Sequence, residues 1–328
     1  MMRFSVAAWL VAAALMAPSP RSVPVTREVF LMGTRAMLTT WAQDRAHGRQ
    51  DLESLLDPLE QTERQLSTWV AGSEISTINR ANARVSLSPS LCVLLADVGQ
   101  WIHATGGTFD PAIGALTSAW GIHEGGRLPS DREIGEARSR SGWDQVAFDA
   151  TTCAAELGEG VTLDVGGFGK GAALDRARQA VPSTVAWLID LGGQVAVNGA
   201  PPGTRGWTVS IADPQRRTAA ALEVRLSSGS ISTSAGSERD AHVNGTRVGH
   251  IIDPRTGHPA PFDGSVTVWH AAALAADVLS TALYVMGVDE GLRWADQHDV
   301  AGCYLLRGGR VRASRAFARR FPVRARFK

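Results

Sequence analysis

The sequence predicts a fold that mixes α-helices with β-strands. Three observations support this: leucines recur at helical spacing in the first third of the chain, runs typical of strands dominate the second half, and a glycine-rich junction precedes those strands. The 328 residues are enough to bury a full core, and this length by itself allows one large domain or two small ones.

The N-terminal residues have the order of a secretory signal peptide. Arg3 precedes a nearly all-apolar stretch, residues 4–17, and Pro18-Ser19-Pro20 follows it. This order is typical of export signals, and the apolar stretch is too short for a comfortable membrane span. We therefore assign residues 1–22 to a signal peptide and expect a periplasmic mature protein. No cysteine follows the apolar stretch, which does not support a lipoprotein anchor.

The elements of the first third follow from periodicity and end signals. Residues 29–41 predict a strand, an interruption at Gly33 and a second strand. Leucines at helical spacing predict a helix over residues 52–66, in which Pro58 either kinks the helix or begins its second half. Ser88-Pro89 is typical of an N-cap and a first helical residue, and it predicts a helix that ends at Gly106-Gly107.

The glycine-rich junction spans residues 163–171 and predicts a strand, a glycine turn and a helix that ends before Pro182. Such a junction directs backbone N–H groups and the positive end of a helix dipole at one point, and its glycines let a phosphate approach the backbone. Its glycine order fits neither the dinucleotide fingerprint nor a Walker motif. Lys170 is the only lysine besides Lys328, which favours a phosphate cradle over a simple tight turn.

The second half is predicted to hold strands over residues 207–211, 221–226, 230–234 and 264–269, followed by a helix over residues 271–286 that ends at Gly287. Asp277 and Thr281 lie four residues apart on this apolar helix and therefore share a face. A buried carboxylate needs a partner, and a carboxylate with a hydroxyl is an oxygen pair suited to Mg²⁺ and phosphate. The alternative is that Thr281 bonds its own helix and Asp277 caps a neighbouring helix.

The net charge and the distribution of basic residues argue against a nucleic-acid-binding protein. The formal net charge is +1, and the body of the chain lacks basic helices, so no nucleic-acid partner is predicted. Arginines crowd the end from Arg307 onward, with residues 322–328 as a basic tail. This composition is compatible with peripheral proximity to a membrane surface, but we expect a solvated, partly disordered terminus.

The three cysteines lie far apart and have no metal-ligand spacing. Cys92 lies within an apolar helical pattern, which predicts a small buried hydrophobic residue. A single disulfide with one thiol left over is the alternative in an oxidising compartment.

Taken in order, the motifs resemble those of the FAD:protein FMN transferase family, known as ApbE. The resemblance runs from about Phe30 to Phe321. It rests on the following pieces: residues 32–34 (Met-Gly-Thr), 66–69 (Leu-Ser-Thr-Trp), 73–76 (Ser-Glu-Ile-Ser), 106–111 (Gly-Gly-Thr-Phe-Asp-Pro), 163–171, 190–193 (Asp-Leu-Gly-Gly), 250–257 (His-Ile-Ile-Asp-Pro-Arg-Thr-Gly) and 276–282 (Ala-Asp-Val-Leu-Ser-Thr-Ala).

This resemblance implies an α+β fold: a single compact ApbE-like, T-fold-related domain over residues 23–321, with mostly antiparallel sheets and flanking helices. It also implies an enzyme that binds FAD as substrate, splits its pyrophosphate with Mg²⁺ and releases AMP. The FMN would be attached through a phosphoester to a Ser or Thr of an exported acceptor protein.

Carried over residue by residue, the resemblance implies three sets of site residues. FAD would be bound by Met32, Trp69, Thr108, Phe109, Asp110, Asp164, Lys170 and Ile251. Mg²⁺ would be held by the carbonyl of Gly167 with Asp277 and Thr281. His250 would be the acid/base near the acceptor hydroxyl, a role that suits a side chain whose ordinary pKa lies near neutrality, although a lone histidine is more often a structural hydrogen-bonding residue.

Three positions depart from the family pattern. Trp69 stands where many relatives have tyrosine, Gln194 stands where asparagine is common, and residues 237–240 lack the usual aromatic residue. Tryptophan can also stack on a flavin ring. Two alternative functions are a Mg²⁺-dependent FAD pyrophosphatase that gives FMN and AMP, and a non-catalytic flavin-binding protein, against which the pair of Asp277 and Thr281 argues.

Overall fold

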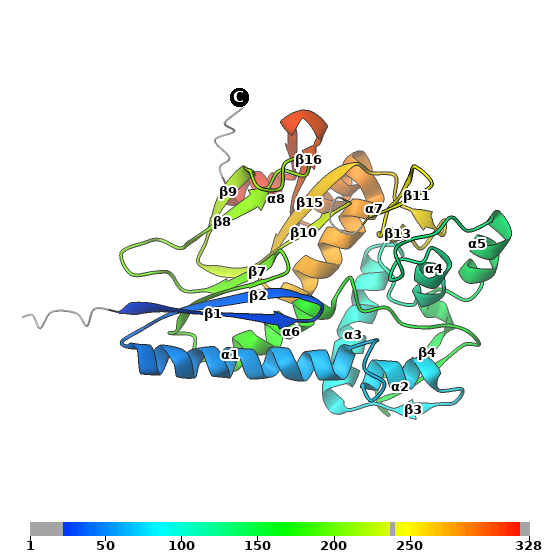
Figure 1. The fold of residues 1–328 in the computed structure, drawn as a ribbon, viewed down its shortest axis with the longest axis horizontal. Coiled ribbons are helices and arrows are strands. Elements are labelled where there is room, and N and C mark those ends of the chain that lie inside the picture. The colour runs from blue at the N-terminus through cyan, green and yellow to red at the C-terminus, as the bar shows by residue number, and fades with distance from the viewer. Residues whose placement is uncertain (1–21, 237–239, 322–328) are drawn as a thin grey trace, which may run out of the picture.

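An antiparallel sheet of eight strands forms the centre of the structure, a computed structural model that describes residues 22–236 and 240–321 (Figure 1). Its strands lie in the order β1-β2-β6-β7-β10-β15-β16-β17, and every neighbouring pair is antiparallel. Their bounds are β1 (Val23–Leu31), β2 (Thr34–Ala42), β6 (Ala186–Leu191), β7 (Gln194–Asn198), β10 (Ser228–Ala235), β15 (Gly264–His270), β16 (Ala301–Leu306) and β17 (Val311–Ala313).

Helices pack against this sheet and also form a second group beside it, as Figure 1 shows. The helices are α1 (Arg45–Leu66), α2 (Glu74–Arg80), α3 (Pro89–Ala104), α4 (Gly114–Ala119), α5 (Asp131–Arg138), α6 (Gly169–Gln179), α7 (Ala273–Gln297) and α8 (Arg315–Arg320). Short strands form the remaining sheets: β3 (Val85–Ser86) with β5 (Ala154–Leu157) and β4 (Val146–Asp149), β8 (Trp207–Ala212) with β9 (Ala220–Leu226), β11 (Ala241–Val243) with β12 (Thr246–Val248), and β13 (Ile252–Asp253) with β14 (His258–Pro259). The α+β prediction with mostly antiparallel sheets is confirmed.

The hairpin of β1 and β2 packs on α1. Met32 and Gly33 form its turn with positive φ angles of 52° and 70°. The carboxylate of Asp44 caps α1 by accepting hydrogen bonds from two backbone amides. Pro58 lies inside α1, which continues as one helix to Leu66. The helix buries Leu52, Leu55, Leu56 and Leu59 against the hairpin, β6 and α6 in one core cluster, whereas Leu66 packs in a second cluster with residues of α2 and α3.

The predicted strand at the start of the glycine-rich junction is wrong. The backbone before α6 is extended, but it forms no ladder, because its hydrogen bonds go to loops and to a side chain. Asp164 N–H donates to the carbonyl of Pro111, and Leu163 N–H donates to the side chain of Asn79. The Asn79 amide returns a hydrogen bond to the Leu163 carbonyl. These hydrogen bonds hold the loop in place, and the predicted helix begins at Gly169.

The last long helix, α7, contacts both α6 and the strands β10 and β15. Gly287 has φ 72° and ψ −176°, so the regular helix ends there as predicted. A further helical segment follows directly and extends the element to Gln297, which was not predicted. The first part of α7 is almost wholly buried, and this burial places Asp277 in the interior beside the start of α6.

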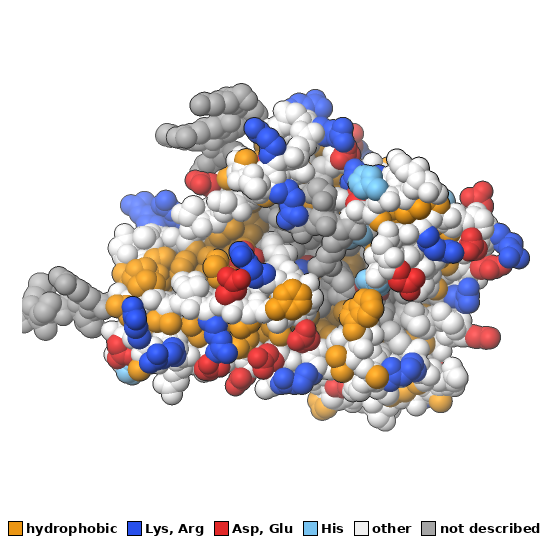
Figure 2. All heavy atoms as spheres, in the orientation of Figure 1, with side chains coloured by type: hydrophobic (Ala, Val, Ile, Leu, Met, Phe, Trp, Pro, Cys, Tyr) orange, Lys and Arg blue, Asp and Glu red, His pale blue; other side chains and the backbone are white. Residues whose placement is uncertain are grey.

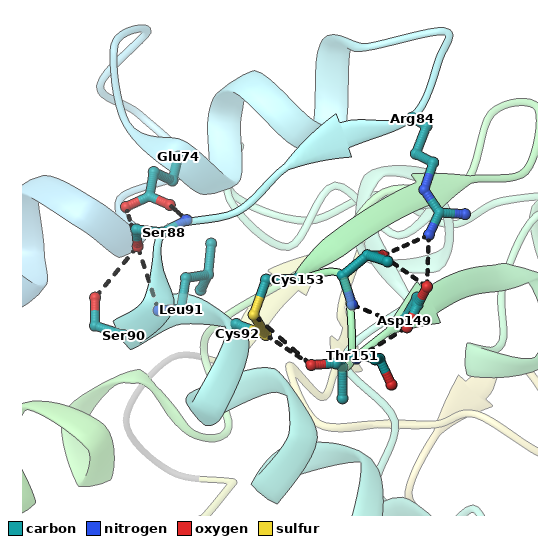
Figure 3. The surroundings of a disulfide bond; sticks show 11 residues. Glu74, Arg84, Ser88, Ser90, Leu91, Cys92, Asp149, Thr151 and Cys153 are labelled. Atoms are coloured by element: carbon teal, nitrogen blue, oxygen red, sulfur yellow. Dashed lines mark hydrogen bonds and ion pairs between the residues drawn. A yellow bond between two sulfur atoms is a disulfide. The ribbon is translucent and has the colours of Figure 1, made fainter.

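A disulfide joins Cys92 in α3 to Cys153 in the turn between β4 and β5 (Figure 3). Cys92 is buried, as predicted, but it is bonded rather than a free hydrophobic residue. The alternative of a single disulfide is therefore correct, and Cys303 is the buried thiol that is left over. The bond connects the helical group to the sheet of β3, β5 and β4.

The described part of the basic terminus, residues 307–321, forms β17 and α8, and aspartates pair with its arginines. The partial disorder of the terminus stays a prediction. Arg312 contacts Asp289 at 2.6 Å, and Arg319 pairs with Asp299. The guanidinium of Arg320 lies 3.1 Å from the centroid of the Trp269 ring, a cation–π contact. Residues 1–21 and 322–328, with the predicted signal and tail, lie outside the described residues. Within residues 22–236 and 240–321, no helix has the length and apolar character needed to cross a membrane.

Candidate functional site

A cleft with two adjoining parts lies where α6, α7, β10 and the loops before them meet. The first part, of about 180 Å³, is lined by Gly167, Asp277, Thr281, His250 and Ile251 among others. The second part, of about 390 Å³, is lined by Met32, Trp69, Glu63 and the turn between β1 and β2. The two parts share the following residues: His123, Asp164, Gly166 and Lys170. Figure 2 shows this face hollowed between the hairpin of β1 and β2 and the group of helices that includes α4 and α5.

The carboxylate of Asp277 forms the inner end of the first part. It is 3% exposed and accepts hydrogen bonds from the backbone amide of Gly171 at 3.0 Å and from Ser232 Oγ at 3.2 Å. The ammonium of Lys170 lies 3.4 Å from its Oδ1. Asp277 therefore does cap the neighbouring helix α6, as the alternative interpretation stated. The same carboxylate also lines the cleft, so its capping contacts hold it in place there.

Thr281 and Gly167 face the same part of the cleft. The hydroxyl of Thr281 lies 3.4 Å from the Asp277 carbonyl and 3.5 Å from Ser234 Oγ, so it too has the helical contact of the alternative interpretation. A Cβ on Gly167 would lie 3.0 Å from the Phe109 ring and 3.5 Å from Thr281 Oγ1. Only glycine therefore passes between these two side chains without displacing one of them, and this keeps the Gly167 backbone beside Thr281.

Lys170 lies in the first turn of α6, which begins at Gly169. Close packing of α6 on α7 fixes this position, because a Cβ on Gly171 would lie 2.5 Å from the carbonyl oxygen of Ala273. The predicted junction of glycines, lysine and helix start therefore lies on the cleft wall. The amides of Gly169 and Gly171 already donate to the Val165 carbonyl and to Asp277, so the Lys170 ammonium and the helix dipole are the features that favour an anion here.

The second part of the cleft brings together Met32, Trp69 and Asp164. The amide of Met32 donates to Glu63 Oε1 at 2.6 Å, which fixes the hairpin turn against α1. The Trp69 side chain is 74% exposed at the rim. Burial by itself would raise the pKa of Asp164, but hydrogen bonds from the His123 ring and the Gly166 amide outweigh it and place that pKa below its usual range.

The predicted residues Thr108, Phe109 and Asp110 are not among the residues that line either part of the cleft. Thr108 and Phe109 are buried, and Phe109 supports the backbone of Gly167 from the core. The carboxylate of Asp110 accepts two backbone amides, from Ala112 and Trp143, and burial raises its pKa above the usual range. Of these three residues, Phe109 is therefore the one that packs behind the site.

His250 lines the first part of the cleft together with its neighbour Ile251. Its ring Nδ1 lies 2.8 Å from Asp240 Oδ1, and its backbone amide donates to the same oxygen at 3.0 Å. Arg247 donates to the other oxygen of Asp240 at 2.6 Å. Burial would raise the pKa of Asp240, but the hydrogen bonds from His250 and Arg247 outweigh it, so that the pKa lies below its usual range. The carboxylate is therefore ionised at neutral pH, and His250 Nδ1 must carry the shared proton.

Sequence reasoning missed two residues of the site, His123 and Asp240. His123 follows Trp120-Gly121 in a loop, and Asp240 precedes His250 by ten positions. Neither belongs to a periodic pattern or to a quoted motif, so the sequence held no signal for them. The structure describes one of the two remaining departures from the family pattern. Gln194 is buried and donates to the Ala273 carbonyl, whereas residues 237–239 lie outside the described residues.

Comparisons with known proteins find similar sequences over most of the chain. The sequence model of the ApbE family matches residues 32–305 of the chain. The FAD:protein FMN transferase of Chlamydia trachomatis is 30% identical over 76% of this chain and 79% of its own length. The protein of the same name from Treponema pallidum is 29% identical over 91% of this chain and 89% of its own length.

Solved structures show the same architecture. The ApbE protein of Thermotoga maritima is 30% identical and superposes with a TM-score of 0.85, covering 91% of this chain and 99% of that chain. The flavin transferase ApbE of Vibrio cholerae is 22% identical, has a TM-score of 0.80 and covers 92% of this chain and 100% of that chain, a likeness in fold.

Proposed function

The chain belongs to the ApbE family, and we infer that it is an FAD:protein FMN transferase. We propose that FAD lies along the whole cleft. The flavin would occupy the part that carries Met32 and Trp69, where an exposed indole offers a stacking surface. The pyrophosphate would lie beside Lys170 and the first turn of α6, where the charge and the dipole favour an anion.

The donor set at Asp277 fits Mg²⁺. The carboxylate of Asp277, the hydroxyl of Thr281 and the backbone carbonyl of Gly167 are all oxygen donors that border one pocket. Among the described residues, no group of three or more His, Cys, Asp or Glu side chains could hold a metal by itself. A site with a single carboxylate suits Mg²⁺, which is commonly held by one or two carboxylates together with substrate phosphates. When bound, Mg²⁺ would neutralise charge that develops on the phosphate oxygens.

His250 serves the transfer step as a general base. The hydroxyl oxygen of an acceptor Ser or Thr forms a bond to the phosphorus of the FMN half, and the bond from that phosphorus to the bridging oxygen breaks. The hydroxyl proton passes to Nε2 of His250, and AMP leaves with the bridging oxygen. Lys170 stabilises the negative charge of the phosphates. Such general-base assistance is typically worth about two to four orders of magnitude in rate.

Asp240 sets the orientation and tautomer of His250. Because Nδ1 donates to the ionised carboxylate at 2.8 Å, the other ring nitrogen, Nε2, is the one that can accept a proton. The Asp240 side chain is 4% exposed, and Arg247 holds its second oxygen. The pair therefore has the base-and-orienting-carboxylate arrangement that activates a weak hydroxyl nucleophile.

One observation carries this proposal: His250, Lys170 and the oxygen donors around Asp277 line the same part of one cleft. The test is product analysis with FAD, Mg²⁺ and exported proteins of the same organism as acceptors. We expect flavin fluorescence on a protein band that survives denaturation, together with free AMP. Free FMN and AMP with no labelled protein would instead identify a pyrophosphatase, and FAD that is bound but intact would identify a binding protein.

We also propose that the protein works in the periplasm on an exported acceptor. The leader pattern of residues 1–22 supports export, and the disulfide between Cys92 and Cys153 supports an oxidising compartment, since cytosolic thiols are kept reduced. Mass spectrometry of the protein from a periplasmic fraction tests this. A mature form that retains Met1, or a reduced pair of thiols in the native protein, would contradict it.

A further inference from the structure

The loop after α4 places His123 at the junction of the two parts of the cleft. This side chain borders both parts, together with Asp164, Gly166 and Lys170. Any ligand that spans the two parts must therefore pass His123. The side chain is 45% exposed, so it is a surface group of the cleft and not a member of the core.

A compact turn holds this loop in place. The amide of Gly126 donates to the Gly121 carbonyl at 2.8 Å, and the amide of Arg127 donates to the Trp120 carbonyl at 2.9 Å. The indole of Trp120 donates to the Gly257 carbonyl at 2.8 Å, which ties the loop to the hairpin that follows His250. These bonds are made by the backbone and by Trp120, and not by the His123 side chain.

His123 contacts two predicted FAD-binding residues that come from different loops. Its Nε2 lies 3.1 Å from Asp164 Oδ2. Its ring meets the Trp69 ring edge to face, with centroids 5.4 Å apart and planes at 84°. Trp69 is largely exposed, so the core does not enclose its indole. Because Asp164 is ionised at neutral pH, Nε2 of His123 is the atom that carries the shared proton.

Resting on the proposed function, we propose that His123 is a positioning residue that fixes Asp164 and Trp69 in the geometry that receives FAD. The hydrogen bond directs one carboxylate oxygen of Asp164, and the edge-to-face contact sets the plane on which the flavin stacks. His123 thereby sets FAD affinity, whereas proton transfer remains with His250. No group is transferred to or from His123.

Two variants separate the contacts of His123. His123→Phe keeps a ring against Trp69 and removes the donor to Asp164, whereas His123→Gln keeps a donor at a similar reach and removes the ring. His103→Gln is the matched control, because His103 is an exposed histidine on α3, outside the cleft. FAD binding is measured by equilibrium titration of flavin fluorescence, and melting temperature is measured on the same preparations.

We expect the Kd for FAD to rise about tenfold in His123→Phe, because the Asp164 and Trp69 side chains would then have to be ordered when FAD binds. It should rise about threefold or less in His123→Gln and stay unchanged in His103→Gln. In FMN transfer assays the loss in His123→Phe should appear in KM and not in kcat. The acid limb of FAD binding should move to higher pH in His123→Phe, because Asp164 loses a hydrogen bond that lowers its pKa. The other ionisable groups that line the cleft are the same in all variants: Glu63, Lys170, His250 and Asp277.

Unchanged FAD affinity in His123→Phe would overturn the proposal. So would a fall in melting temperature that accompanies the loss of affinity, since His123 would then act through stability. Equal losses in His123→Phe and His123→Gln would refute the role of the hydrogen bond to Asp164. A wild-type protein that binds FAD but transfers no FMN would refute the proposed function and leave the binding comparison valid, so the two failures are distinguishable.

Discussion

Replacing Asp240 by Asn tests the pair that activates His250. In the structure one oxygen of Asp240 accepts both the ring and the backbone amide of His250, at 2.8 and 3.0 Å, and the other oxygen accepts Arg247 Nε at 2.6 Å. Asparagine has a single oxygen. Its NH₂ group must therefore face either Arg247 or the two N–H groups of His250, which are also hydrogen-bond donors. In either placement His250 loses an ionised partner.

The size of the effect is bounded by the role of His250 itself. A group that acts only through His250 cannot cost more rate than the base supplies, which is about 10²- to 10⁴-fold. We expect the rate of FMN transfer in Asp240→Asn to fall about 100-fold at neutral pH. FAD affinity should stay within about twofold, because Asp240 borders neighbouring pockets and not the FAD cleft.

The assay is single-turnover transfer to acceptor, with FAD affinity measured in parallel. Asp263→Asn is the matched control, because Asp263 contacts Arg247 at 3.1 Å without touching His250. This control should keep the wild-type rate. Full transfer activity in a folded Asp240→Asn variant, or an equal loss in Asp263→Asn, would refute the reasoning.

Three other predictions follow from the same geometry. Asp277→Ala removes the only carboxylate of the predicted Mg²⁺ site and should abolish FAD cleavage. Chelation should abolish cleavage in the wild type as well. FAD cleavage by the wild type in excess chelator would show that Asp277 has a structural role only. The double variant Cys92→Ser and Cys153→Ser removes a disulfide between residues 61 positions apart, which restricts the unfolded chain. It should lower the free energy of unfolding by about 4 kcal/mol, measured by denaturant titration against the oxidised wild type. His270 should make folding stability depend on pH, because burial lowers its pKa from 6.5 and its neutral ring accepts the Ala272 amide. The unfolded chain then takes up the proton first, so stability is full above about pH 6.5 and decreases as the pH falls below it; melting temperatures at pH 5 and 7.5 should differ less in His270→Gln.

Much of the fold could be predicted because local signals and burial agree. The leucines of α1 lie at helical spacing and are buried on one face, and Ser88 caps α3 as its position before Pro89 predicts. The strand predicted around Leu163 failed for a physical reason. An apolar run shows that a segment is buried, but not which backbone group or side chain accepts its hydrogen bonds, and here the partner is Asn79.

The candidate site divides in the same way. Asp277, Thr281 and Lys170 belong to regular elements or their first turns, and the structure brings all three to one pocket. His123 and Asp240 lie in loops, and their roles depend on partners that only the folded chain places beside them. Phe109 was predicted to contact FAD but does not line the cleft. It packs behind Gly167, because an aromatic side chain next to a buried turn is more stable in the core than in an open cleft.

The ratio of AMP released to FMN bound on the acceptor tests the transferase claim most directly. Both products should be quantified from one reaction with FAD, Mg²⁺ and the acceptor, the first by chromatography and the second by intact mass of the acceptor. Transfer at phosphorus predicts one FMN on the acceptor for each AMP, with no free FMN, and loss of both products in His250→Ala. Free FMN in amounts equal to AMP, with an unmodified acceptor, would contradict the account, because water would then be the nucleophile.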